Sequence, residues 1–232
     1  MTDELPVPAA LYPLHGRYGT SDISPNNNPP GIPSDIQLAP GPYGHPKGSY
    51  QFFGRYTSYV EIPNNGGLDT TYSITVLAWM KRENDNGPIF NYGTNLWAFH
   101  LWIVDGKLFG RAVTRYNGRL LNPVSSSQPV SMSWLYVGLT YDYSSGVMKL
   151  WINGNAVDQT IAGSAKLTTN FDVRIGAKDD INDPRYFQGR ICCVQVYSKA
   201  LSQQEIIAVQ NRIINTGGYW CNMENANEAD RA

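Results

Sequence analysis

The sequence contains no long apolar run, no extended run of basic residues and no excess of charge of either sign. Its 18 Lys and Arg residues nearly balance 19 Asp and Glu residues, giving a formal net charge of -1 at pH 7. No basic run is longer than Lys81-Arg82, so we expect no nucleic-acid partner. No apolar stretch approaches the length of a transmembrane helix, so we expect no membrane insertion. The first residues are acidic and lack the apolar segment of a signal peptide.

Cysteine is also scarce, and the three cysteines do not have the spacing of a metal-binding motif. Cys192 and Cys193 are adjacent, so their side chains should point to opposite faces of a strand. Cys192 would share its face with Val194 and Val196 and is expected to be a buried free thiol. We expect a disulfide between Cys193 and Cys221 that holds the C-terminal segment against the body. The alternative is three reduced cysteines in a cytosolic protein.

The sequence lacks the residue patterns of the main hydrolytic enzymes. Retaining glycosidases need two carboxyl groups about 5–5.5 Å apart, and on a strand two glutamates four residues apart share a face. Only Glu224 and Glu228 have that spacing, and they lie in a polar tail, whereas Asp179 and Asp183 lie in a loop. No Gly-X-Ser-X-Gly motif is present. We therefore expect that the protein is not an enzyme.

What the sequence does contain is a series of short strand-like segments separated by Gly- and Asn-rich turns. In residues 134–154, two runs of alternating large residues flank a Ser-Ser-Gly turn, and the second run ends in Asn-Gly. This pattern is typical of an antiparallel hairpin followed by another tight turn. Strands are expected at residues 10–14, 49–53, 59–62, 73–81, 87–92, 98–104, 107–114, 134–142, 146–152, 171–175 and 187–197. Their number and spacing predict an all-β, antiparallel sandwich of two sheets.

One short helix is expected near the C-terminus, at residues 202–212. Ser202 and Glu205 have the spacing of a capping box, and the expected buried stripe consists of Leu201, Ile206, Val209 and Ile213. Residues 1–48 are rich in Pro, Gly, Asn and Ser, and we expect them to form an N-terminal arm packed on the body. The main domain is expected over residues 49–221, with a polar C-terminal tail at 222–232.

The ordered set of segments resembles the laminin G-like and pentraxin-like domains of the concanavalin A-like lectin/glucanase superfamily. The resemblance rests on Phe53-Gly54 followed by residues 58–63, on the Trp-containing strand at 73–81, and on the hairpin at 134–154. It continues through residues 173–176, 187–191 and 197–206 in the same order. The resemblance implies a jelly-roll sandwich whose members mostly bind ligands, and an extracellular protein whose native signal sequence is not present in this chain.

The resemblance also implies a candidate calcium site, because pentraxins hold calcium with acidic and amide side chains from two loops. The matching metal ligands in this sequence are Asp85, Asn86, Asp179, Asp180 and Asp183. Calcium takes six to eight oxygen ligands, which two such loops meeting in space could supply. Lys178 stands where pentraxins place an acidic residue, so their second calcium is not expected. The alternative is that Asp and Asn serve only the turns, by bonding their own backbone.

Aromatic residues make up 12% of the chain and are the candidates for contacts with a sugar ring. The candidates are spread over several loops and strands: Trp97, Phe99, Trp102, Tyr116, Tyr143, Trp151, Tyr186 and Trp220. Two functions follow. The first is a lectin-like recognition domain that binds glycans or charged head-groups with calcium. The second is a structural adhesion module of an extracellular or biomineral matrix protein, which binds proteins or polysaccharide without a metal. The sequence leaves the oligomeric state open.

Overall fold

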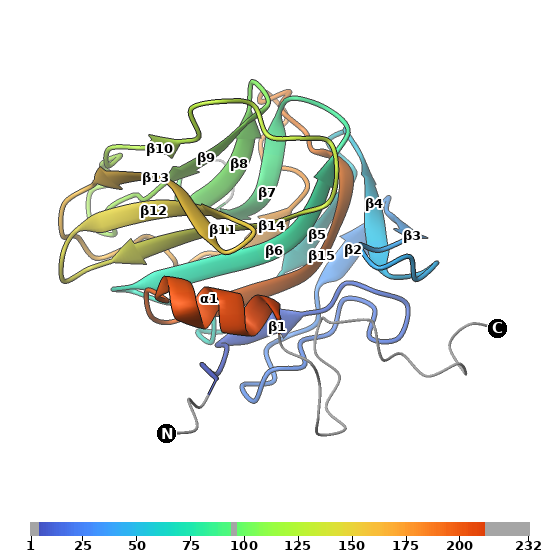
Figure 1. The fold of residues 1–232 in the computed structure, drawn as a ribbon, viewed down its shortest axis with the longest axis horizontal. Coiled ribbons are helices and arrows are strands. Elements are labelled where there is room, and N and C mark those ends of the chain that lie inside the picture. Colours follow the sequence, from blue (N-terminus) through green and yellow to red (C-terminus); the bar gives the residue numbers. More distant parts are fainter. Residues whose placement is uncertain (1–4, 94–96, 212–232) are drawn as a thin grey trace.

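The computed structural model describes residues 5–93 and 97–211, which form two packed antiparallel sheets and one helix (Figure 1). In the first sheet the strand order is β13 (Asn155–Ile161), β12 (Val147–Ile152), β11 (Leu135–Asp142), β6 (Ile74–Arg82), β15 (Gln188–Tyr197), β4 (Ser49–Phe53) and β3 (Gln37–Ala39), with β1 (Ala10–Tyr12) also paired to β15. In the second sheet it is β10 (Val124–Ser125), β9 (Lys107–Arg111), β8 (His100–Val104), β7 (Gly87–Tyr92), β14 (Val173–Ile175), β5 (Tyr59–Ile62) and β2 (Ile32–Ser34). The expected all-β jelly-roll sandwich is confirmed.

The core lies between the two sheets and is filled by every second residue of the central strands. Leu139 on β11 and Leu101 on β8 belong to the same buried apolar cluster. The sheets approach so closely that a Cβ added to Gly110 would lie 2.5 Å from a methyl group of Leu139. Because side chains alternate across a strand, this inward set determines which residues face outward.

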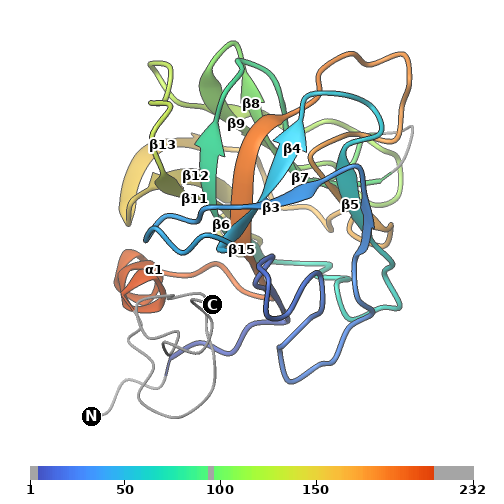
Figure 2. The ribbon, with the colours of Figure 1, turned by 90° about the vertical axis from the view of Figure 1, so that its right-hand side faces the viewer.

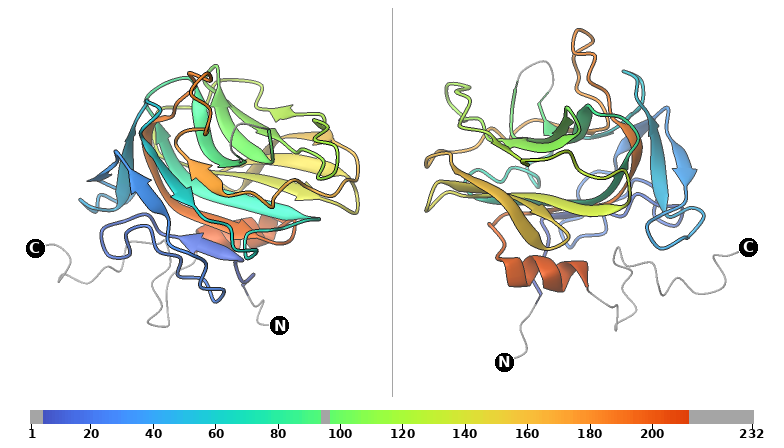
Figure 3. Two further views of the ribbon diagram at one scale, coloured as in Figure 1. Left: turned by 180° about the vertical axis from the view of Figure 1, so that it is seen from behind. Right: turned by 45° about the horizontal axis from the view of Figure 1, so that its top comes forward.

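The outer face of the eight-stranded sheet is covered by α1 (Gln203–Gln210), which lies against it in Figures 1 and 3. Leu201 and Ile206 pack there with Leu77, Tyr136, Trp151 and Tyr197 in a second buried cluster. The capping box is present: Glu205 N donates to Ser202 Oγ (3.3 Å), and Ser202 N donates to Glu205 Oε2 (2.8 Å). Val209 is half-buried, and Ile213 lies outside the described residues. No helix in the described ranges is long and apolar enough to span a membrane.

The sequence pattern identified the central strands and missed four peripheral ones, β2, β3, β10 and β13. β2 and β3 belong to the N-terminal arm and pair with β5 and β4 respectively, as Figure 2 shows for β3. The arm therefore contributes strands to both sheets. β13 is an edge strand whose residues are nearly all exposed, so it lacks the apolar alternation on which the prediction relied.

A bulge in β15 contradicts the expected placement of Cys192. Cys192 pairs with Trp79 and Gln195 pairs with Leu77, so β15 contains one extra residue between these two pairs. Cys193 occupies that position with a φ of 54°. The bulge breaks the strict alternation of faces, so Cys192 does not share a face with Val196, which pairs with Val76. The free, buried state of Cys192 is confirmed.

The Cys193–Cys221 disulfide stays a prediction, because Cys221 lies outside the described residues. We expect one reactive thiol per chain when the unreduced protein is denatured and titrated with a thiol reagent. That thiol should be Cys192, which is buried and free in the fold. Peptide mapping of the labelled cysteine gives the assignment, and three labelled cysteines would contradict the bridge.

Candidate functional site

The two acidic turns proposed from the sequence meet at one rim of the sandwich. The turn after β6 contains Asn84, whose Nδ2 donates to the Tyr186 carbonyl at 2.7 Å. Gln188 N donates to Asn84 Oδ1 at 3.1 Å, and a Cβ on Gly87 would lie only 2.1 Å from Phe187 N. The turn that holds Asp85 is therefore bonded to the C-terminal end of the loop at residues 177–187, which holds the other three aspartates.

At this rim, however, each of the four carboxylates has a basic partner of its own. The ion pairs are Asp85–Arg82 (2.6 Å), Asp179–Arg174 (3.0 Å), Asp180–Lys178 (3.0 Å) and Asp183–Arg185 (2.7 Å). Asn86 Oδ1 accepts from Asp105 N at 3.1 Å. No group of three His, Cys, Asp or Glu side chains within residues 5–93 and 97–211 is placed to hold a metal. In this arrangement a calcium ion would have to displace the basic side chains that are paired with these carboxylates.

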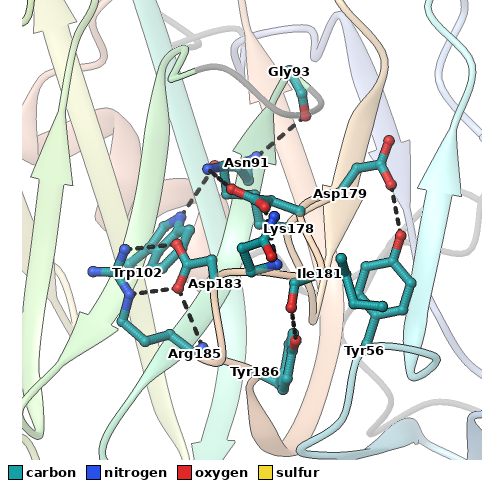
Figure 4. A network of polar contacts seen from close by, with 12 residues as sticks. Tyr56, Asn91, Gly93, Trp102, Lys178, Asp179, Ile181, Asp183, Arg185 and Tyr186 are labelled. Atoms are coloured by element: carbon teal, nitrogen blue, oxygen red, sulfur yellow. Dashed lines mark hydrogen bonds and ion pairs between the residues drawn. The ribbon is translucent and has the colours of Figure 1, made fainter.

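The 177–187 loop is held over the outer face of the seven-stranded sheet by the Asp179–Arg174 ion pair to β14 and by Arg185, whose guanidinium lies over the Trp102 ring on β8 (Figure 4). Arg185 forms a bidentate pair with Asp183, whose side chain is only 9% exposed. A hydrogen bond from Arg185 lowers the pKa of Asp183, and one from Lys178 lowers the pKa of Asp180. The aspartates therefore stay ionised and fix the loop in place.

Where this loop contacts the sheet lies a group of aromatic rings and cations that we call the aromatic–cation cluster. It consists of Trp97, His100, Trp102, Phe109, Arg111, Lys178 and Arg185. On β8, His100 and Trp102 alternate with Leu101 and Ile103, which lie in the core. On β9, Phe109 and Arg111 alternate with Leu108 and Gly110 in the same way.

The rings and cations of the cluster contact one another directly. Lys178 Nζ lies 4.3 Å from the centre of the Trp97 ring, and the Arg185 guanidinium lies 4.8 Å from that of Trp102. His100 and Phe109 are stacked with centroids 5.9 Å apart. Trp102 Nε1 donates to Asn91 Oδ1 at 3.2 Å (Figure 4). Cations over aromatic faces are stabilised by the ring quadrupole, so the cluster holds its cations near a surface that can also stack on a ligand ring.

Arg111 differs from the other cations of the cluster, because it has no carboxylate partner among the described residues. Its guanidinium lies 5.2 Å from the centre of the Phe109 ring, and its Nε is buried without an acceptor. Burial lowers the pKa of Arg111. A half-buried guanidinium without an anionic partner is costly, and an anionic ligand would supply the missing acceptor.

His100 is buried between these groups and is held neutral. Burial lowers its pKa to about 4, and the nearby charges of Arg111, Arg185 and Lys178 act in the same direction. Its Nδ1 lies 2.7 Å from the Ala98 carbonyl, which can only accept, so Nδ1 carries the proton. The imidazole adds an aromatic face to the cluster without adding a charge at neutral pH.

This burial predicts a pH dependence of stability. Below pH 6.5 the unfolded chain binds a proton at His100 that the folded chain does not bind. The free energy of unfolding should therefore fall by about 2–3 kcal/mol between pH 7 and pH 4.5. Urea unfolding at both pH values measures this fall. His100→Asn cannot titrate and should show a smaller fall; equal falls in the two proteins would contradict the assignment.

The structure separates the aromatic candidates into three groups. Phe99, Trp102 and Trp151 are buried, with 0%, 1% and 5% of their surface exposed. Trp97 and Tyr186 are half-buried at the rim, and Tyr116 and Tyr143 are exposed. Trp220 lies outside the described residues. Sequence reasoning missed Phe109, Arg111 and Arg185; the signal for the first two was a ring and a cation alternating with core residues on one strand.

A family model described as the concanavalin A-like lectin/glucanases superfamily, of the laminin G type, matches residues 53–207. The chain belongs to this superfamily. No curated protein matches the sequence. The resemblance to laminin G-like and pentraxin-like domains is thereby confirmed, and the arrangement of strands described above is that of the superfamily.

Several solved structures share the fold. The binding domain of Paraclostridial Mosquitocidal Protein 1 matches 90% of this chain with a TM-score of 0.69 and 18% identity. The receptor-binding domain of botulinum neurotoxin mosaic serotype C/D matches 88% of the chain with a TM-score of 0.67 and 17% identity. The serotype D ligand-binding domain in complex with N-acetylneuraminic acid matches 88% of the chain with a TM-score of 0.66 and 18% identity. The chain spans about half the length of these proteins, covering 52%, 50% and 50% of them. At this identity the likeness shows the fold alone.

Proposed function

We propose that this domain is a non-catalytic, lectin-like recognition domain that binds acidic saccharides at the aromatic–cation cluster. The observation that carries the proposal is Arg111, a half-buried cation whose Nε has no acceptor in the described part of the chain. The neighbouring cations Lys178 and Arg185 are already bonded to carboxylates. Arg111 is therefore the group of this cluster with free capacity for an anion.

The chemistry of the cluster suits a sugar that carries a carboxylate. A guanidinium presents a planar fork of donors that matches a carboxylate in bidentate geometry. Phe109 supplies an apolar ring beside it, and the half-buried Trp97 lies in the same cluster, next to His100 and Trp102; the apolar face of a pyranose can stack on such rings. The fold is shared with a receptor-binding domain of a botulinum neurotoxin and with a botulinum neurotoxin ligand-binding domain in complex with N-acetylneuraminic acid. An extracellular location, where such glycans are displayed, is part of the proposal.

The test uses N-acetylneuraminic acid and its C1 methyl ester, which has nearly the same shape without the negative charge. We expect the free acid to bind at least tenfold more tightly than the ester in isothermal titration, because a charge-assisted pair is lost. Arg111→Ala should weaken binding of the acid by a similar factor and leave binding of the ester nearly unchanged.

Lys107→Ala is the matched control, because Lys107 lies on the same strand and the same face as Arg111. This variant should bind the acid like the wild-type protein. Equal affinities for acid and ester, or normal binding by Arg111→Ala, would contradict the proposal. A matrix protein that binds the wild type and Arg111→Ala equally would favour the structural adhesion module instead.

Calcium dependence stays a separate prediction from the family resemblance. If calcium binds at Asp85, Asn86, Asp179, Asp180 and Asp183, it should raise the melting temperature by mass action, and a chelator should reverse the rise. Asp180→Asn should abolish the effect. A melting temperature that is identical with calcium and with chelator would contradict calcium binding, while leaving saccharide binding by Arg111 intact.

A further inference from the structure

A second group of aromatic side chains lies in the segments that surround the turn after β9. Tyr72, Tyr116 and Tyr143 are 50%, 81% and 36% exposed, and Lys166 lies among them. We call these four residues the tyrosine platform. They come from four separate segments of the chain, and none of them belongs to the buried apolar clusters. Packing of the core therefore does not explain their presence.

The side chains of the platform contact one another rather than the core. The rings of Tyr72 and Tyr143 meet edge to face with centroids 5.1 Å apart. Lys166 Nζ lies 5.4 Å from the centre of the Tyr72 ring and 5.8 Å from that of Tyr116. Lys166 forms no ion pair with a carboxylate of the described residues, so its charge is available to a ligand.

The backbone beneath the platform is fixed by hydrogen bonds. Arg115 N donates to the Lys166 carbonyl at 2.8 Å, which joins the Tyr116 turn to the Lys166 segment. Tyr143 N donates to Ser73 Oγ at 3.0 Å, which joins Tyr143 to the segment of Tyr72. Asp69 accepts from Arg115 Nη2 and from Thr169 Oγ1. The platform is therefore built before any ligand arrives, which reduces the entropy cost of binding.

We propose that the tyrosine platform binds an acidic polysaccharide, with sugar rings stacked on Tyr116 and Tyr72 and a carboxylate or sulfate bound by Lys166. Exposed tyrosine rings give apolar faces for the sugar, and their hydroxyl groups can bond its polar edge. Tyr116 belongs to the turn that follows β9, the strand of Arg111. The proposed function concerns a single sugar at the aromatic–cation cluster. The tyrosine platform would add binding of a polysaccharide on a different surface.

The probe is a hyaluronan decasaccharide, with a chitin hexasaccharide as the neutral comparison. We expect Tyr116→Ser and Lys166→Ala each to weaken decasaccharide binding at least fivefold in isothermal titration, because a stacking face or a charge is lost. Tyr116→Ser should keep the wild-type melting temperature, since Tyr116 is 81% exposed. Ile32→Ser, which removes an exposed apolar side chain on β2 (55% exposed), is the matched control and should bind normally.

Wild-type affinity of both platform variants would overturn the inference, as would equal binding of the acidic and neutral oligosaccharides. Cosedimentation with phosphatidylcholine vesicles containing 20% phosphatidylserine, abolished by Tyr116→Ser, would also overturn it in favour of a membrane surface. N-acetylneuraminic acid binding should be unchanged in Tyr116→Ser and weakened in Arg111→Ala. Decasaccharide binding that depends on Tyr116 in the absence of N-acetylneuraminic acid binding would support the platform and contradict the proposed function.

Discussion

The alternation of side chains along β8 and β9 is the constraint on which the candidate site depends. Leu101, Ile103 and Leu108 fill the space between the sheets, and Gly110 leaves room for Leu139. Once these residues face inward, the pleat places His100, Trp102, Phe109 and Arg111 on the opposite face. A shift of register by one residue would exchange the two sets, so the packing of the core and the position of the site are determined together.

The two outer faces of the sandwich are covered differently, and the proposed binding site lies on the face with the ionic cover. The face of the eight-stranded sheet is closed by α1 through a second apolar cluster. The face of the seven-stranded sheet is covered by the 177–187 loop, which is held by ion pairs and by cations over tryptophan rings. An ionic cover keeps charged and aromatic groups near the surface. Asp179, Asp180 and Asp183, three of the residues that suggested calcium, form the ion pairs of this loop.

The fold could be predicted from the sequence because many short strand-like segments, such as residues 134–142 and 146–152, are separated by turns that contain Gly or Asn. The expected bounds of β4, β5 and β7 match those observed. Edge strands such as β13 carry little apolar signal, and the β15 bulge at Cys193 gives none. In the site, the pairing of Asp183 with Arg185 follows from local spacing, whereas the missing partner of Arg111 depends on contacts between segments distant in the sequence.

Saccharide binding at Arg111 is tested most directly by the NMR signal of the Arg111 Nε–H group, assigned by comparison of the wild type with Arg111→Lys. We expect this signal to shift on titration with N-acetylneuraminic acid, whereas the signal of Arg82, which donates through Nε to the Val130 carbonyl, should stay in place. Binding of N-acetylneuraminic acid without a shift of the Arg111 signal would show that the saccharide does not bind at Arg111.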